Sequence, residues 1–566
     1  MKDHNETPRV PPFLIWLVLA LGSILGILLI LHHAAHTPTY TIDSYFYLSK
    51  AKELAEGHGL RTSWNDGLDT KYFPGYSIFL AIPFMSGLSY ISLQMISYLL
   101  CVLFMLRVAA ALDFDWPAQA LAATAFAINP IVIKWFSLPM AEGVALALSL
   151  LSVNLAFRFK QAGGYSYLFA ASAVGGMAVL TRIEALFLLA VFAAIFFPAR
   201  KSLSWLHLLI GVVVFLLPLF AYWASLAVAA NQSPAYLGEF RGTFLRVGLI
   251  KNFIYNVWVP FGFMHRPVKS LQEIEFMSPM AIMGAVWLLV GGVIFLEGLF
   301  CATLGWLGQR ARGLGFLFLA YASLHSLWYY RYERFMLMAV PLAAIVWVEQ
   351  LRALALLTVR KGVGPANPLS SENRGHDATP EKWGHDATPE KWGHDAAPEK
   401  WGHDATPEKW GHDAASCPHF SGVALMLLAQ ALLAAGGLYF GNLYGARHAQ
   451  ALQEDTAWLS FSDIAQSVNA LNSASHAPVL TDLGPHLAYY VDAHTYLDTE
   501  HGNYWHRAFP PERTLEEMNG LGVRFVVTRK RLDKWLEEHH IPPEARQRLE
   551  VVNAAASDVS IIKYSP

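Results

Sequence analysis

The stretch that decides the fold runs from residue 11 to residue 60, PPFLIWLVLALGSILGILLILHHAAHTPTYTIDSYFYLSKAKELAEGHGL. Its first part, Pro11 to Leu31, is long enough to cross a bilayer, which takes a helix of about 20 apolar residues. A cleaved signal peptide is the alternative, because small residues follow at Ala34 and Ala35, although a signal core needs only about 7–15 apolar residues. We interpret the run as an uncleaved membrane anchor.

The second part continues to KYFPGY at residues 71–76 and holds one early acid, Asp43, among tyrosine and phenylalanine residues. A carboxylate just beyond a membrane helix is more often a solvated loop residue than a catalyst. Here, however, an amphipathic helical segment (50–56) follows and ends at the glycines of GHG (57–59). The pattern favours a loop that lies along the membrane, with Asp43 at the rim of a lipid-facing cavity.

The composition of the whole chain is that of a polytopic membrane protein. Of its 566 residues 54% are hydrophobic and 15% are charged, whereas soluble domains carry roughly a quarter charged residues. The net charge of -2 provides no overall field, so nucleic acid is not an expected partner. The three cysteines include no CxxC pair and indicate neither a disulfide framework nor a zinc site.

Apolar runs recur along the chain, and the basic residues between them set the predicted topology. The run at 75–87 is too short for a crossing of about 20 residues, and we interpret it as a re-entrant or interfacial helix. With the N-terminus inside and about eleven crossings, every inside turn is basic, in line with the positive-inside rule, and the C-terminus lies outside. The other crossings are expected near 90–110, 117–134, 143–159, 165–181, 183–199, 205–229, 278–300, 314–330, 335–351 and 420–440.

A tract between the last two runs has a different composition. The unit GHDATPEKW recurs in tandem from Gly375 to Trp410. Its regular His and Asp raise metal binding as an alternative, but the proline in each unit, the charge and the lack of an apolar face favour a disordered linker. The predicted parts are a transmembrane bundle (1–360, with the first outer loop at 34–76), a cytoplasmic linker (361–419), a last transmembrane helix (420–444) and an outer α/β domain (445–566).

The outer α/β domain is predicted from short strands that alternate with helical patterns. Strands are expected at 478–482, 488–491, 523–528 and 560–564, and helices near 512–520 and 530–539.

Two outer turns place acids at the mouth of the bundle. Glu142 begins a helix in SLPMAE, where a favourable interaction with the helix dipole and a functional role weigh evenly. Arg182 and Glu184 lie together in TRIE (181–184) at the outer interface. The alternative to a functional role is that the two charges only neutralise each other while the arginine side chain extends to the membrane surface.

A third outer turn is basic. RYERF (331–335) holds Arg331 and Arg334 against the positive-inside tendency, and Lys71 adds positive charge on the same side. Such a turn suits an anionic ligand such as phosphate, because arginine offers a planar fork of donors to phosphate oxygens. As the alternative, the orientation of neighbouring helices alone explains why some of these basic residues lie outside.

These motifs, in their order, carry a family resemblance. The first loop DSYFYLSKAKELAEGHGL with YFPGY, the PMAE entry, the LTRIE turn, and RF followed by Pro341 resemble the GT-C membrane glycosyltransferases. The branch is the bacterial one akin to protein O-mannosyltransferases and lipid A aminoarabinose transferases. The resemblance covers residues 1–360 and, more loosely, the last helix and the outer domain. The chain departs in its nonapeptide insert, in FPG where many relatives have PPG, and in a single acid at Asp43 where protein mannosyltransferases carry an adjacent pair.

The resemblance implies a fold and a reaction. The fold would be a mostly α, polytopic GT-C bundle in a bacterial inner membrane, with the site on the extracytoplasmic face. The reaction would transfer a sugar, with inversion, from a polyprenyl-monophosphate donor to a glycolipid, glycan or protein acceptor. Some relatives with several loop acids bind a divalent cation, which is possible here, but the chain offers no cluster that demands a metal or another cofactor.

The resemblance also implies roles for the residues singled out above. Asp43 would be the catalytic general base on the acceptor hydroxyl, or would orient that hydroxyl. Arg334, with Arg331 and Lys71, would stabilise charge on the leaving phosphate. The other three candidates would shape the acceptor or sugar pocket; they are Glu142, Arg182 and Glu184.

Two other classes of function stay open at the level of sequence. A transporter or lipid flippase also has a polytopic bundle with charges in it. Against it, the two halves of the chain show no inverted repeat, and the charges cluster on the outer side. A scaffold or sensor with an outer domain and a repeat-bearing loop is the third class.

Overall fold

The computed structural model describes much of the helical part of the chain and much of its C-terminal part. The apolar runs at 278–300 and 420–440, the repeat tract, and two candidate residues, Lys71 and Arg331, lie outside the described residues. The described residues are 12–36, 41–63, 72–196, 204–230, 252–253, 256–257, 259–261, 309–326, 333–349, 461–483, 485–497, 513–554 and 559–565.

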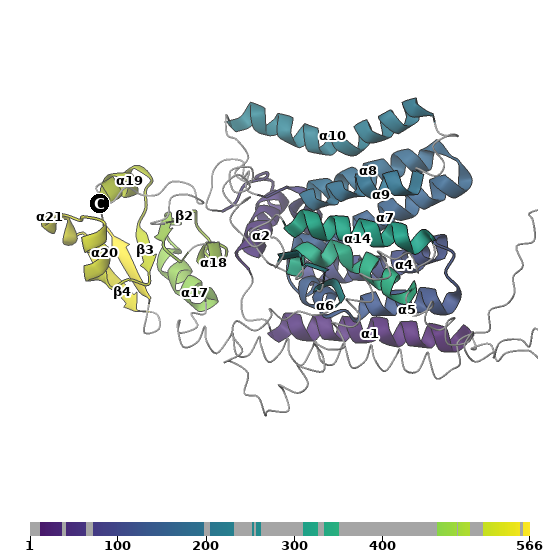
Figure 1. Ribbon diagram of the computed structural model, residues 1–566. Helices are drawn as coiled ribbons and strands as arrows, with labels where there is room; N and C mark the ends of the chain where they lie inside the picture. Colours follow the sequence, from purple (N-terminus) through teal and green to yellow (C-terminus); the bar gives the residue numbers. More distant parts are fainter. Residues whose placement is uncertain are drawn as a thin grey trace, which may run out of the picture.

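The first of these parts is a bundle of roughly parallel helices (Figure 1). Among the described residues, four helices are long and apolar enough to cross a membrane, or five if a bent pair counts as one span, which confirms a mostly helical, multi-pass membrane protein. The count of about eleven crossings stays a prediction. The elements are α1 (Pro12–His36), α2 (Ile42–Ala55), α3 (Gly75–Met85), α4 (Tyr90–Ala111), α5 (Trp116–Ala127), α6 (Pro130–Phe136), α7 (Ala141–Ala162), α8 (Tyr165–Thr181), η1 (Ile183–Phe187), α9 (Leu188–Phe196), α10 (Trp205–Ala230), η3 (Val259–Phe261), α14 (Gln309–Ser326), η5 (Glu333–Ala339) and a helix over 340–349.

Helix α7 lies inside the bundle, packed against α4 and α8, while α10 covers α8 and α1 lies against α5 (Figure 1). The first turns of α7 are rich in small residues, such as Gly143 and Ala145, which let neighbouring helices approach closely. By contrast, α10 exposes large apolar side chains, among them Leu209 and Phe220. An exposed apolar face of this kind is what a lipid-facing helix requires.

The run predicted at 117–134 is a bent pair of helices. Helices α5 and α6 meet at an angle of 52°. At the bend Asn129 caps α6 by accepting a hydrogen bond from the amide of Ile131 at 2.9 Å, and Pro130 occupies the first helical turn, where its missing N–H costs nothing. The Asn129 amide also donates to the carbonyl of Pro260 at 3.0 Å, which ties the bend to η3.

The first outer loop is more helical and more buried than the sequence predicts. Helix α2 begins at Ile42, capped by Thr41, so that Asp43 lies in its first turn instead of in a preceding loop. Nine of its 14 residues are buried, including the aromatic residues Tyr45 and Phe46. The aromatic side chains of the loop therefore pack against protein, and its course along the membrane stays a prediction.

Helix α3 does not carry the chain across the bundle. At its start the hydroxyl of Tyr76 accepts a hydrogen bond from Gln94 near the start of α4, at 2.9 Å. The same Gln94 amide donates to the carbonyls of Leu138 and Met140, which lie just before α7. The starts of α3, α4 and α7 therefore lie at one end of the bundle, as a re-entrant helix requires.

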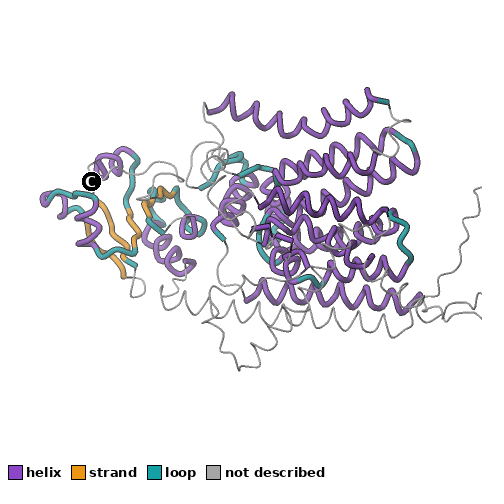
Figure 2. Tube along the Cα trace, in the orientation of Figure 1, coloured by secondary structure: helices purple, strands orange, loops and turns teal. Residues whose placement is uncertain are grey.

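The C-terminal part contains a five-stranded mixed sheet (Figure 2). In the order β2-β1-β3-β5-β4, β1 is parallel to β2 and β3, and β5 is antiparallel to β3 and β4. The elements are α17 (Phe461–Asn472), β1 (Val479–Thr481), α18 (Pro485–Ala488), β2 (Thr495–Leu497), α19 (Thr514–Gly520), β3 (Phe525–Thr528), α20 (Leu532–Glu538), α21 (Pro543–Arg546), β4 (Leu549–Ala554) and β5 (Ser560–Tyr564).

Three of the four strands predicted in this part are present, as β1, β3 and β5, and the two predicted helices are α19 and α20. The strand predicted at 488–491 is wrong. The amides of Tyr490 and Val491 turn back to the carbonyl of Leu487 at the end of α18. The ring of Tyr489 instead packs on Tyr45 of α2, with ring centroids 5.8 Å apart, so this aromatic pattern serves contact with the bundle.

Candidate active site

The structure brings five of the seven predicted site residues together at one end of the bundle; the other two are outside the described residues. They come from elements far apart in the chain: the start of α2, the start of α7, the end of α8, η1 and η5. Two ion-paired groups result, one around Asp43 and one around Arg182.

Asp43 is held at both of its carboxylate oxygens. The hydroxyl of Tyr72 donates to Oδ1 at 2.5 Å, and Nη1 of Arg334 donates to Oδ2. The side chains of Asp43 and Arg334 retain 18% and 17% of their exposure, so the pair is reachable by a ligand without being fully solvated. A charge-assisted pair in such a place is strong and specific in direction.

Arg182 joins the other two acids. Its Nη1 donates to Oε1 of Glu142 at 2.8 Å, and its Nε and Nη2 donate to the two oxygens of Glu184 at 3.1 and 2.6 Å. Arg182 and Glu142 are buried, with 9% and 1% of the side chain exposed. Arg182 and Glu184 therefore do neutralise each other, and Arg182 also pairs with Glu142 on α7. Because the Arg182 side chain is buried, it does not extend to the membrane surface.

An aromatic ring lies between the two groups. The guanidinium carbons of Arg334 and Arg182 lie 5.1 and 5.6 Å from the centroid of Phe335, within the range of a cation–π contact. The backbone carbonyl of Phe335 accepts a hydrogen bond from Tyr321 of α14 at 2.8 Å. Phe335 therefore contacts both arginines.

The surroundings of Tyr72 and Arg334, the two hydrogen-bond donors to Asp43, keep both side chains protonated. Burial raises the pKa of Tyr72 well above its usual value, and the neighbouring Asp43 carboxylate raises it further, so the phenol stays a neutral donor. For Arg334, burial alone would lower the pKa, but the carboxylates of Asp43 and Glu142 outweigh it and raise the pKa. Both partners of Asp43 thus keep their protons at physiological pH.

A divalent cation does not fit these acids as they stand. Each of the three carboxylates is engaged by a guanidinium: Asp43 by Arg334, and Glu142 and Glu184 by Arg182. Among the described residues, the three side chains close enough to share an ion are Glu53, Glu56 and His58 at the far end of α2. The geometry at the site therefore supports charge stabilisation by arginine.

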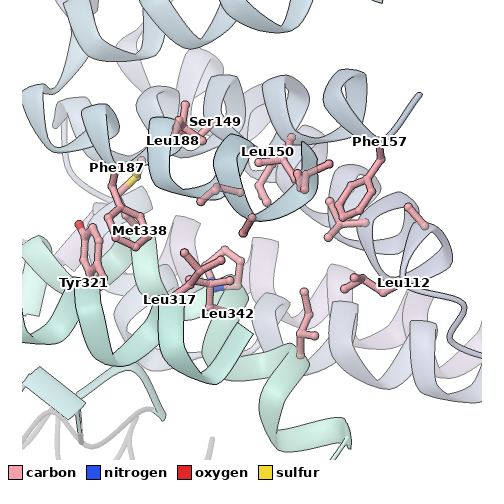
Figure 3. A pocket seen from close by; sticks show the side chains of 18 of the residues that line it. Leu112, Ser149, Leu150, Phe157, Phe187, Leu188, Leu317, Tyr321, Met338 and Leu342 are labelled. Atoms are coloured by element: carbon pink, nitrogen blue, oxygen red, sulfur yellow. The ribbon is translucent and has the colours of Figure 1, made fainter. Parts of the chain in front are cut away.

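An apolar cavity of about 430 Å³ extends from this site along the bundle (Figure 3). Glu184 and Tyr321 line it at the site end, and Asp113 and Lys160 line it at the other end of α7. Between them it is walled by apolar side chains, such as Leu150 and Leu342. Its lining on α7 spans residues 146 to 160, about 21 Å at 1.5 Å per residue.

Sequence reasoning missed several residues of the site. Tyr72 lies in the quoted KYFPGY motif, but nothing in the motif shows that its hydroxyl reaches Asp43. Lys50 is fully buried and lies seven positions after Asp43, on the same face of α2, where its Nζ donates to the carbonyl of Tyr72 at 2.9 Å. The spacing of seven positions from Asp43 is the one sequence signal that could have indicated Lys50.

Comparison with solved structures identifies the architecture. The crystal structure of ArnT from Cupriavidus metallidurans bound to undecaprenyl phosphate aligns with 97% of this chain and 99% of its own, with a TM-score of 0.55 at 13% identity. The apo form of the same protein aligns with 97% and 98%, with a TM-score of 0.53 at 14% identity. The chain has the GT-C fold.

The GT-C fold that the resemblance implies is confirmed. No protein-family model and no curated protein sequence matches the chain. The GT-C fold thus rests on the structural alignment, which runs through the C-terminal part as well as the bundle.

Proposed function

We propose that the chain is an integral membrane glycosyltransferase that moves a sugar from a polyprenyl-monophosphate donor to an extracytoplasmic acceptor. The observation that carries the proposal is an apolar cavity that reaches Glu184, which is paired with Arg182 in the ion-paired cluster. A lipid-linked sugar phosphate has this shape: a long apolar tail, an anion and a sugar. The related fold of ArnT, which holds undecaprenyl phosphate, supports the same carrier class.

Each part of the site has a task in this reaction. The acceptor hydroxyl attacks the anomeric carbon on the face opposite the phosphate, its proton passes to Asp43, and the bond from that carbon to the phosphate oxygen breaks. A single displacement of this kind inverts the anomeric centre. Arg334 stabilises the charge that develops on the leaving polyprenyl phosphate, and Arg331 and Lys71 are assigned to the same task from the sequence.

The acids around Arg182 serve the sugar side of the pocket. Glu142 and Glu184 are fixed by the guanidinium, so their remaining lone pairs have constant directions from which to accept hydrogen bonds from sugar hydroxyls. The acceptor is a glycolipid, a glycan or a protein, and we place the site on the outer face of a bacterial inner membrane from the distribution of basic turns.

The decisive experiment uses purified protein and a labelled polyprenyl-phosphate sugar. Free polyprenyl phosphate and a labelled acceptor are expected with the wild type. Asp43→Asn should reduce turnover by at least about 100-fold, as loss of a general base does, and Arg334→Ala should weaken both donor binding and rate. Asp533→Asn, at an exposed position of α20, is the matched control.

Two results would contradict the proposal. Substantial turnover by Asp43→Asn would reject the assigned base. Movement of the labelled lipid across the bilayer without any sugar transfer would show that the chain is a flippase. Mass comparison of envelope glycolipids and glycoproteins from cells with and without the gene then identifies the acceptor.

A further inference from the structure

In the arrangement that the structure shows, Asp43 is the counter-ion of Arg334. Tyr72 donates to its Oδ1 and Arg334 donates to its Oδ2. An acceptor hydroxyl requires one of these oxygens, and a donor phosphate requires Arg334. The two proposed functional groups of the site therefore neutralise each other until one of them changes partner.

We propose that the donor phosphate draws Arg334 away from Asp43, and that this exchange exposes Oδ2 as the base while Tyr72 keeps Oδ1 in place. The inference rests on the proposed function and deepens it, because it sets the order of events. The lipid-linked donor binds first, and only then does Asp43 accept a proton from the acceptor.

Tyr72 is suited to stay with Asp43 during the exchange. Its backbone carbonyl accepts the hydrogen bond from buried Lys50, and the rings of Phe46 and Tyr47 pack against its ring at centroid distances of 5.3 Å each. All three contacts come from α2, the helix that carries Asp43. Tyr72 is thus fixed relative to Asp43 and acts as a positioning residue for the base.

Arg334 is more accessible to a ligand than Arg182, with 17% of its side chain exposed against 9% for Arg182. The exchange asks Arg334 to trade a carboxylate for a phosphate, so one strong charge-assisted contact replaces another. A carboxylate that loses a cationic partner also binds a proton more tightly, so Asp43 becomes a stronger base when the acceptor arrives.

The test is the affinity of undecaprenyl phosphate for the purified protein in nanodiscs, measured by calorimetry. If Asp43 competes with phosphate for Arg334, Asp43→Asn should bind this lipid about tenfold more tightly than the wild type, since a charge-assisted contact no longer has to be broken. Glu53→Gln removes an acid from the same helix, where it pairs with Arg61, and should change the affinity less than about twofold.

A double-mutant cycle separates exchange from general electrostatics. In an Arg334→Ala background, Asp43→Asn should no longer tighten binding. Unchanged or weaker binding by the single Asp43→Asn variant overturns the exchange, and so does an equal gain in the Arg334→Ala background. If the wild type does not bind undecaprenyl phosphate at all, the proposed function fails with it; normal wild-type binding without a gain leaves the function standing.

Tyr72→Phe tests the positioning role. It should keep the donor KM within about twofold and lower kcat about tenfold, because the carboxylate loses its fixed direction only in the step where it takes the proton. A merely structural role would raise KM and lower the melting temperature together, which contradicts the assignment. Tyr490→Phe is the matched control, because the ring of Tyr490 packs on Tyr45 of α2.

Discussion

Arg182 shows how a single side chain organises this site. It lies at the end of α8, where the backbone is extended, and its guanidinium contacts Glu142 on α7 and Glu184 on η1. All three side chains are at most 12% exposed. Buried acids of this kind are tolerable only while the cation is present, because an unpaired buried charge is costly.

Arg182→Gln should therefore destabilise the protein by about 3–5 kcal/mol, the usual cost of breaking a buried ion pair from one side. Thermal unfolding in detergent measures the loss. The triple variant with Glu142→Gln and Glu184→Gln removes the stranded charges as well and should recover most of the stability without recovering activity. If the triple variant were less stable than Arg182→Gln, the cost would not be electrostatic.

At the scale of elements, the position of α3 depends on one glycine. A Cβ at Gly75 would lie 2.6 Å from the carbonyl oxygen of Leu180 at the end of α8. This close approach keeps α3 against α8 and, through the residues just before it, holds Tyr72 next to Asp43. The FPG motif of the sequence thus has a packing reason: the glycine lets two backbones meet.

Gly75→Val should cost about 1–3 kcal/mol, as overpacking does, and should also lower activity by displacing Tyr72. Thermal unfolding and the transfer assay measure the two effects on the same sample. Gly520→Ala, where a Cβ would meet no atom within 4 Å, is the matched control and should be neutral. Full activity of Gly75→Val would show that α3 does not support the site.

The elements also show what the sequence could predict. Residues two apart, such as Arg182 and Glu184, are readily paired from sequence, and long apolar runs gave the helices of the bundle. Strands β2 and β4 were missed: β2 has three residues, and Val551 and Val552 of β4 are both exposed, so neither shows a buried alternating pattern. Asp43 and Arg334 could be assigned to one face only by counting basic turns, because no spacing rule relates residues so far apart.

For the whole molecule, the described part of the site is built from residues 41 to 349, ahead of the repeat tract. Excising residues 370–415 should therefore leave the rate of transfer within about twofold, if the tract is the linker that its proline and charge indicate. The transfer assay on the excised protein, with membrane insertion checked separately, measures this. Complete loss of activity with normal insertion would show that the tract takes part in function.

The C-terminal part is joined to the wall of the site. The amide of Thr495 in β2 donates to the carbonyl of Ser63 at 3.3 Å, and the Ser63 hydroxyl donates to the carbonyl of Ala488 at the same distance. With the contact of Tyr45 and Tyr489, these bonds fix the first outer loop from the side of α18 (Figure 1). The loop that carries Asp43 is therefore positioned by both parts of the chain.

The pairing of Asp43 with Arg334 has a consequence for how the protein is made. The two residues are 291 positions apart. At a synthesis rate of about 5–20 residues per second, Asp43 waits roughly 15–60 s after its own translation before its partner leaves the ribosome. A nascent chain that has already inserted its first helices holds the base without the arginine that would engage the donor. If Asp43 and Arg334 act as proposed, transfer activity begins as one event late in biogenesis, when η5 joins the bundle.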